Sequence, residues 1–330
     1  MKIGKVLVTG GNGFLGSNVA RELFRRGYEV KLMMRPSADT NVIADIPCEL
    51  YYGEISNTKD TLRAVEGCDY VVHTASITRQ WSVSFRDYEE INVKGTMNVV
   101  DACLFHDVKK LIHISTANTI GPGSRLKPAN ELNSFMLTNI NSGYISSKYI
   151  AQQYVMEQVE RKKLPAVIIN PTFMIGPYDT KPSSGKIILH GMNKRIVFYP
   201  PGGKNFVHIG DVCTGIANAL EKGKVGDCYL MAGENLDYRD FFKLLNKVSG
   251  QNPLLIRIPV FVLKSVGLIG TLLEIFSRKT GKLNHSSAYM LCLYNYYSGK
   301  KSERELQLDY TSTEKAINSA LLWFRENNYC

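Results

Sequence analysis

A glycine-rich segment directly after an apolar run most constrains what this chain can fold into. The run KVLVTG, residues 5–10, is typical of a buried strand, and a helical pattern follows it. Between them, Gly10, Gly13 and Gly16 have the spacing GxxGxxG. A tight turn from strand to helix needs glycine dihedral angles, and close approach of a pyrophosphate leaves no room for side chains. The segment therefore predicts the phosphate-binding turn of a β-α-β unit.

Apolar strands alternate with helical patterns through the first half of the chain. Alternation of this kind predicts a parallel sheet with helices on both faces, which is a Rossmann-type doubly wound α/β fold. Strands are expected at residues 5–10, 29–35, 49–53, 69–74, 110–115 and 166–170, with helices at 14–26, 58–66, 87–105 and around Tyr144.

The pattern loosens from about residue 171, where prolines and glycine-rich turns interrupt it. We expect residues 1–170 to form the dinucleotide-binding domain and residues 171–330 to form mainly a smaller substrate-binding lobe. Residues 225–233 have the pattern of another strand. Segments within about 205–231 are therefore expected to return to the Rossmann core.

The end of the second expected strand indicates which cofactor is preferred. An Asp or Glu about 20 residues beyond the glycines favours NAD, because it binds the ribose hydroxyls. Here the strand ends in Arg35, and its guanidinium fork suits the 2′-phosphate of NADP. NADP(H) is the prediction and NAD(H) the alternative, in which Arg35 is only a surface charge.

The segment YISSK puts Tyr144 and Lys148 on one face of a helix. Two more tyrosine–lysine pairs with this spacing occur within residues 296–301, so spacing alone does not identify a site. The fifth strand, however, ends in Ser115 and Thr116, and ligands of parallel sheets bind at the carboxyl ends of strands. We therefore expect Tyr144 and Lys148 beside this strand end, and the 296–301 pairs outside the nucleotide half.

Together, TGGNGFLG, the strand-end Thr116 and the YISSK helix resemble an extended short-chain dehydrogenase/reductase of the NAD-dependent epimerase/dehydratase superfamily. The resemblance covers the whole chain and is greatest to the dihydroflavonol-reductase-like branch, which includes hopanoid-associated sugar-epimerase-like proteins. Further segments that carry it are GEI at 53–55, HTAS at 73–76, INVKGT at 91–96, NPTFMIGPYDTKPSSGKII from 170, NFVHIGDV at 205–212 and the late KKSEREL.

The resemblance implies a catalytic role for three residues. Tyr144 would donate or accept the proton, Lys148 would lower the pKa of that tyrosine and bind the nicotinamide ribose, and Thr116 would hydrogen-bond the reacting oxygen. Ser115 is a second candidate for the hydroxyl role. The arrangement is chemically sensible because a free tyrosine, with a pKa near 10, is a poor base at neutral pH.

The resemblance also implies further contacts. Glu54 and Ile55 would lie at the adenine, and Pro171, Thr172 and Met174 on the nicotinamide side. The full cofactor set is Gly10, Gly13, Phe14, Leu15, Gly16, Arg35, Glu54, Ile55, Thr74, Ala75, Ser76, Tyr144, Lys148, Pro171, Thr172 and Met174. The substrate set is Ser76, Trp81, Thr116, Asn118 and Tyr199, and no metal site is expected.

Three functions fit these residues. The first is an NADP(H)-dependent oxidoreductase that interconverts a carbonyl and an alcohol on a small organic substrate. The second is an NAD(P)-dependent sugar-nucleotide epimerase or dehydratase. Such enzymes commonly have an arginine just before the motif matching NFVHIGDV, where this chain has Lys204, a point charge without the bidentate fork. The third is a non-catalytic nucleotide sensor, which the intact Thr116, Tyr144 and Lys148 disfavour.

Composition limits the partners and the compartment. The net charge of +10 suits an anionic ligand, but the basic residues are spread along the chain, which argues against nucleic acid. Seven scattered cysteines without a CxxC pair indicate reduced thiols and a cytoplasmic protein. His73, His113 and His208 are dispersed and are expected to be hydrogen-bonded packing residues. A homodimer is plausible.

The most apolar run, Val260 to Phe276, is interrupted by Lys264 and Glu274. It is shorter than the ~20 apolar residues of a transmembrane helix, so no membrane span is expected. We expect a buried or substrate-covering helix there, with peripheral membrane contact as the alternative.

Overall fold

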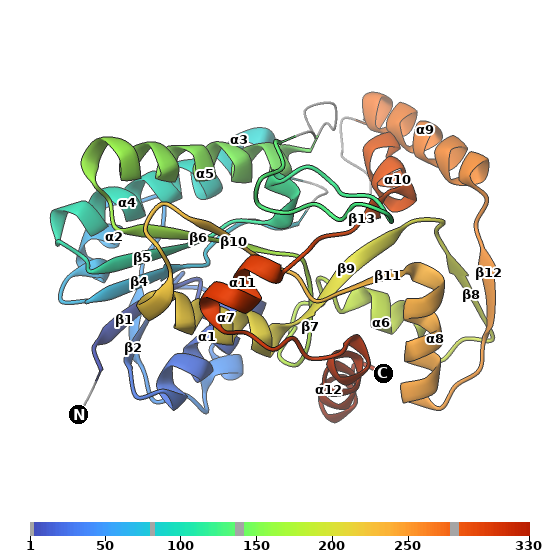
Figure 1. The fold of residues 1–330 in the computed structure, drawn as a ribbon, viewed down its shortest axis with the longest axis horizontal. Helices are drawn as coiled ribbons and strands as arrows, with labels where there is room; N and C mark the ends of the chain where they lie inside the picture. Colours follow the sequence, from blue (N-terminus) through green and yellow to red (C-terminus); the bar gives the residue numbers. More distant parts are fainter. Residues whose placement is uncertain (1–2, 80–82, 136–141, 278–283) are drawn as a thin grey trace.

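The computed structural model describes residues 3–79, 83–135, 142–277 and 284–330, with side chains omitted from residue 272 to 277. Its centre is a seven-stranded sheet in the order β10-β6-β5-β4-β1-β2-β3 (Figure 1). Every neighbouring pair is parallel, and the strand order reverses beside β1, which confirms the predicted doubly wound fold. The strands are β1 (Lys5–Thr9), β2 (Glu29–Met34), β3 (Glu49–Tyr52), β4 (Tyr70–His73), β5 (Lys110–Ile114), β6 (Ala166–Pro171) and β10 (Cys228–Met231).

Helices cover both faces of this sheet because its strands present apolar side chains to both. On β1, Val6 and Val8 belong to one buried cluster and Leu7 to the other, as the two-residue period of a strand requires. In Figure 1 the two helical layers lie above and below the sheet. One contains α1 (Phe14–Arg25) and α7 (Ile209–Lys222), and the other contains α2 (Thr58–Val65), α4 (Gly95–Phe105) and α5 (Gly143–Lys162).

The second half of the chain builds a smaller lobe around a third apolar cluster, which includes Phe206, Phe241 and Phe324. A mixed sheet contains β7 (Phe173–Ile175), β9 (Gly203–His208), β11 (Glu234–Asp237) and β13 (Tyr294–Asn295), and β8 (Ile196–Tyr199) pairs with β12 (Leu254–Arg257). The helices are α6 (Lys186–Gly191), α8 (Tyr238–Ser249) and α12 (Thr313–Glu326). Between these elements, α7, β10 and later α11 (Lys300–Leu306) pack on the large sheet.

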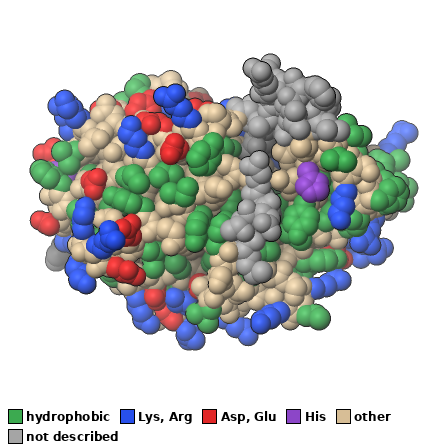
Figure 2. Space-filling view, turned by 90° about the horizontal axis from the view of Figure 1, so that it is seen from above, with side chains coloured by type: hydrophobic (Ala, Val, Ile, Leu, Met, Phe, Trp, Pro, Cys, Tyr) green, Lys and Arg blue, Asp and Glu red, His purple; other side chains and the backbone are tan. Residues whose placement is uncertain are grey.

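The apolar run forms helix α9 (Val260–Ser277), which packs on α10 (His285–Cys292). The two helices pack closely at Gly267, where an added Cβ would lie 2.6 Å from the Cβ of Ala288. The prediction of a buried helix is nevertheless wrong for most of the described side chains: Leu263 is 5% exposed, but Phe261 is 72% exposed and Ile269 is 57% exposed. The end of the molecule that carries α9 shows hydrophobic side chains beside basic ones (Figure 2). Among the described residues, no helix is long and apolar enough to cross a bilayer.

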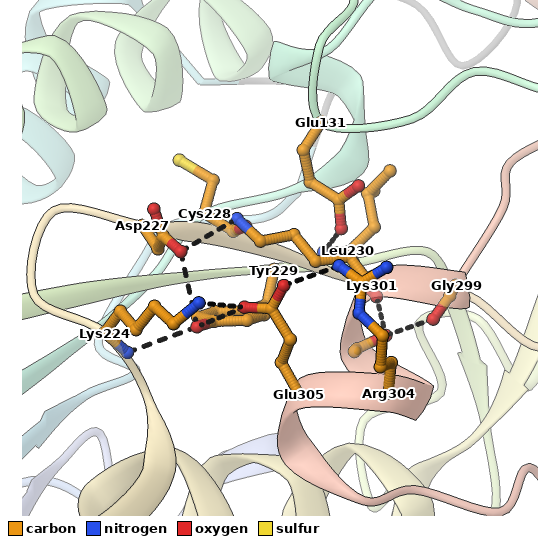
Figure 3. Close-up of polar contacts among 11 residues, drawn as sticks. Glu131, Lys224, Asp227, Cys228, Tyr229, Leu230, Gly299, Lys301, Arg304 and Glu305 are labelled. Atoms are coloured by element: carbon orange, nitrogen blue, oxygen red, sulfur yellow. Dashed lines mark hydrogen bonds and ion pairs between the residues drawn. The ribbon is translucent and has the colours of Figure 1, made fainter.

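Polar side chains close the outer edge of the large sheet at β10 (Figure 3). The carboxylate of Glu131 accepts a hydrogen bond from the main-chain N–H of Leu230 at 2.9 Å, and Ser302 donates to the carbonyl of the same residue at 2.6 Å. Lys301 pairs with Asp227 at 3.1 Å and donates to a main-chain carbonyl of β10 at 3.0 Å. The main-chain groups that an edge strand would otherwise leave open are thus bonded to side chains from α11 and from the loop before α5.

Candidate active site

The glycine segment forms a tight turn between β1 and α1. Gly10 has a φ of +69°, a conformation that favours glycine, and a Cβ there would lie 2.9 Å from the Cα of Ala75. A Cβ on Gly16 would lie 2.3 Å from the carbonyl oxygen of Gly10. No side chain caps α1, so the N–H groups of its first turn, Phe14 to Gly16, remain available to an anion.

The other predicted adenosine contacts lie at the carboxyl ends of β2 and β3. Arg35 follows β2 directly and is exposed. Glu54 is exposed and its main-chain N–H donates to Asp60 at 3.0 Å, whereas Ile55 is 8% exposed and packs under Gly95. The structure therefore places both Glu54 and Ile55 just beyond the carboxyl end of β3, and of the two only Glu54 is exposed to solvent.

Thr116, Tyr144 and Lys148 meet at the carboxyl end of β5. The side chain of Thr116 lies close enough to Tyr144 to lower the pKa of its phenol, and Lys148 Nζ donates to the carbonyl oxygen of Ile114 at 2.5 Å. Thr116 also accepts a hydrogen bond from the main-chain N–H of Asn118 at 3.3 Å. Next to it, the buried hydroxyl of Ser115 has no hydrogen-bond partner within the described ranges. Both candidate hydroxyls thus lie beside the YISSK helix.

Burial shifts the pKa of both Tyr144 and Lys148. Burial raises the pKa of Tyr144 to about 12, an effect that the side chain of Thr116 only partly offsets. Burial also lowers the pKa of Lys148 to about 8. The ammonium group of Lys148 is hydrogen-bonded to the carbonyl oxygen of Ile114. At neutral pH the pair is therefore a protonated phenol beside an ammonium group.

Two of the three histidines expected to be dispersed are neighbours. His73 and His113 face each other on β4 and β5, with ring centroids 5.6 Å apart. His73 bonds the hydroxyls of Thr9 at 2.8 Å and Thr96 at 3.0 Å, but neither ring nitrogen of His113 has a partner in the described part of the chain. The expectation of a hydrogen-bonded His113 is therefore wrong. Burial and the charge of Lys148 lower the pKa of both rings, which keeps them neutral.

An asparagine that sequence reasoning missed holds the loop after β4 against α5. Asn92 accepts from Ser76 at 3.0 Å and from the N–H of Ile77 at 2.8 Å, and it donates to Ser147 at 2.9 Å. Asn92 lies in a π-helical turn, Glu89–Lys94, that joins α3 (Phe85–Tyr88) to α4 and interrupts the single helix predicted at 87–105. The signal for it was the segment INVKGT. A second hydrogen bond holds the loop Thr74–Ser76 in place: the hydroxyl of Thr74 donates to the carbonyl oxygen of Thr9 at 2.6 Å.

A pocket opens beside Thr116 on the side of the smaller lobe. It has an empty volume of about 330 Å³, part of it open to solvent. The predicted residues that line it are Thr116, Asn118, Pro171 and Thr172, and those that sequence reasoning had not placed there are Ala117, Phe173, Lys204, Asn205, Asn295 and Tyr297. Tyr297 comes from the 296–301 stretch expected to lie apart. It reaches the pocket because β13 pairs with β9.

Three further predicted contacts do not line this pocket or are not described. Tyr199 is 8% exposed and belongs to the apolar cluster of the smaller lobe, because alternate side chains of β8 point into that cluster. Met174 is half-buried on β7 and packs against the cluster around α1 and α7. Trp81 lies outside the described residues.

Comparison with known proteins assigns the family. The model of the NAD dependent epimerase/dehydratase family matches residues 6–232. The sterol demethylase protein B of Methylococcus capsulatus is 29% identical over 328 residues, which cover 97% of this chain and 98% of that protein. A putative dihydroflavonol 4-reductase of Synechocystis is 26% identical over 327 residues, which cover 98% of this chain and 95% of that protein.

A solved structure agrees with this assignment. The crystal structure of gox2253 has a TM-score of 0.87 and 33% sequence identity, with 98% of each chain covered. Members of the matched family are NAD(P)-dependent enzymes that act on small molecules. With the glycine turn, the sheet order and the Thr116, Tyr144 and Lys148 cluster in place, this chain belongs to the NAD dependent epimerase/dehydratase family, the extended short-chain dehydrogenases/reductases.

Proposed function

We propose that this enzyme is an NADP(H)-dependent oxidoreductase that interconverts a carbonyl and an alcohol on a small organic substrate. The observation that carries the proposal is the cluster of Thr116, Tyr144 and Lys148 at the sheet edge, beside a pocket. The name of the Synechocystis relative, a putative dihydroflavonol 4-reductase, supports carbonyl reduction. We also propose that residues 1–170 bind mainly the cofactor and residues 171–330 mainly the substrate.

The residues at the sheet edge fit a dinucleotide. The turn at Gly10 and Gly16 is a cradle that a Cβ would fill, and the first turn of α1 offers its N–H groups to the pyrophosphate. Arg35 would bind the 2′-phosphate, and Lys148 would bind the hydroxyls of the nicotinamide ribose. When bound, the cofactor supplies or accepts the hydride.

The protonated phenol of Tyr144 is suited to act as the acid in carbonyl reduction. Because burial holds the pKa of Tyr144 at about 12, its phenol carries a proton at neutral pH and is a general acid. It gives this proton to the carbonyl oxygen as that oxygen gains the electron pair of the C=O bond, and it is left as a phenolate. Thr116 donates a hydrogen bond to the same oxygen, and protonated Lys148 stabilises the phenolate by its charge.

Carbonyl reduction should therefore depend on pH through Lys148. Its protonated form is the active one, so kcat should be constant at lower pH and fall by about tenfold per pH unit above pH 8. Tyr144 stays protonated through this range. The measurement is kcat at saturating substrate from about pH 6 to pH 10. Because Lys204 titrates in the same range, the fall should persist in Lys204→Gln. A constant kcat up to pH 10 would contradict the role of Lys148.

Arg35 should set the cofactor preference. Replacing Arg35 by alanine removes charged hydrogen bonds to the 2′-phosphate, which should raise the Kd for NADPH about 10- to 100-fold and leave that for NADH unchanged. Fluorescence titration of both nucleotides measures this. Arg63→Ala, in the last turn of α2, is the matched control and should change neither Kd. Equal effects on NADPH and NADH would refute the 2′-phosphate contact.

The exchange behaviour of the nucleotide tests the function itself. A reductase releases its oxidised cofactor after each turnover, so the purified protein should bind and release NADPH freely and should consume it with a carbonyl substrate. An epimerase or dehydratase returns the hydride to the same molecule. One equivalent of nucleotide that resists exchange would therefore overturn the reductase proposal and favour that class.

A further inference from the structure

We propose that Lys204 and Tyr297 form a binding site for a substrate carboxylate in the pocket beside Thr116, so that the substrate is an oxo acid or the matching hydroxy acid. This inference rests on the proposed function, because it places a second recognition point next to the reacting carbonyl. Both residues line the same pocket as Thr116. The smaller lobe supplies both of them, from β9 and from the segment after β13.

Lys204 carries a charge that the described residues do not neutralise. Its Nζ lies over the ring of Phe173, 5.0 Å from the centroid, and no acidic residue is among those that line the pocket. Desolvation lowers the pKa of Lys204 to about 8, as expected for an ammonium group removed from water without a carboxylate partner. An arriving anion would provide that partner.

Tyr297 provides a second donor. Its side chain is 3% exposed, and its hydroxyl has no hydrogen-bond partner within the described ranges. Buried hydroxyls are normally hydrogen-bonded, so an unpartnered one in a residue that lines a pocket indicates a ligand group. The neighbouring side chain of Asn205 is not available for this role. It donates to Gly233 at 3.0 Å and to Asn235 at 2.8 Å, and it accepts from Thr172 at 2.7 Å.

The donor set favours a carboxylate over a diphosphate. One ammonium group and one hydroxyl match the single charge and two oxygens of a carboxylate. A diphosphate carries more charge, and Lys204 is the only cation among the residues that line this pocket. The aromatic ring of Phe173 and the Tyr297 ring form apolar walls on which a carbon chain could pack.

The test measures ligand binding apart from turnover. Calorimetry is done with octanoate, octanamide and octyl phosphate, with and without saturating NADP⁺. Wild type should bind octanoate more tightly than octanamide. Lys204→Gln should weaken the binding of octanoate by about 10- to 100-fold and leave the affinity for octanamide unchanged. Lys204→Arg should retain most of the affinity for octanoate. Tyr297→Phe keeps the aromatic ring and should weaken the binding of octanoate less than Lys204→Gln does. Lys59→Gln, on the exposed side of α2, is the control.

The outcomes separate the two proposals. Equal binding of octanoate and octanamide would overturn the carboxylate site, whatever the enzyme reduces. Tighter binding of octyl phosphate than of octanoate would overturn the carboxylate and assign the site to a phosphate group. A Lys204-dependent preference for octanoate in a protein that neither exchanges nor consumes NADPH would sustain the site and refute the reductase function. Oxidation of 2-, 3- and 4-hydroxyoctanoate, each against its methyl ester, then identifies the spacing between carboxylate and reacting carbon.

Discussion

Tyr144→Phe is expected to lower turnover by about 10²- to 10⁴-fold, the usual contribution of a general acid, and to leave the Kd for NADPH nearly unchanged. The substitution removes only the hydroxyl that donates the proton. The ring stays in its partly buried site on α5, and the glycine turn, Arg35 and Lys148 are untouched. The measurement is kcat with a carbonyl that the wild type reduces, together with a fluorescence titration of NADPH.

The control for this variant is Tyr154→Phe. Tyr154 lies on the same helix, but it packs against the apolar cluster beneath α4 and α5, away from Thr116. Its loss of a hydroxyl should leave kcat within about twofold of wild type, as surface and packing changes away from a site usually do. Retained turnover in Tyr144→Phe, or an equal loss in both variants, would show that Tyr144 is not the acid.

Gly10→Ala is expected to abolish most cofactor binding, with a rise in the Kd for NADPH on the order of 100-fold, because it displaces a loop that must lie within an ångström of its place. At a φ of +69° the added Cβ is strained, and it also lies 2.9 Å from the Cα of Ala75. The loop Thr74–Ser76 has to move away to make room. The titration of NADPH measures the loss directly.

Gly67→Ala is the matched control for Gly10→Ala, because the two glycines have nearly the same backbone conformation. The φ of Gly67 is +73°, nearly that of Gly10, but a Cβ there would meet nothing within 4 Å. Both alanine variants should therefore lose ~1–2 kcal/mol to backbone strain, measurable as a lower free energy of unfolding in urea, and Gly10→Ala should lose more because of its contact with Ala75. Only Gly10→Ala should lose its affinity for NADPH. Equal affinity in the two variants would mean that the turn does not hold the pyrophosphate.

The sequence predicts the large sheet well because its strands are short, continuous apolar runs, as strands covered on both faces must be. The glycine turn and the placing of Tyr144 beside Thr116 follow from the same regularity, since parallel strands put their carboxyl ends at one edge. Helix α9 shows the limit of this reasoning. An apolar run predicts burial, but among the described elements α10 is the one that packs extensively on α9, and most of the described side chains of α9 stay exposed.

The parts of the site that could not be predicted depend on contacts between distant residues. Tyr297 lines the pocket with Thr116 because β13 pairs with β9, and nothing in the local pattern around residue 297 encodes that pairing. The sequence motif indicates that Lys204 is a positive charge on the substrate side. It does not show that the pocket around Lys204 has no acidic residue. The π turn at Asn92 is hidden for a different reason: its residues continue a helical pattern, and the extra residue per turn becomes visible only in the backbone.

The closed edge at β10 has a consequence for how the chain folds as it is made. Six strands of the large sheet are complete once residue 171 has been synthesised, but β10 comes from residues 228–231 and, apart from Glu131, the side chains that cover it come from residues 301–305. On the ribosome, the nascent sheet therefore exposes the unpaired edge of β6 until β10 emerges, and β10 waits further for Lys301 and Ser302. Exposed edges of this kind can pair with other chains, so this interval is the period in which the nascent sheet is most prone to aggregation.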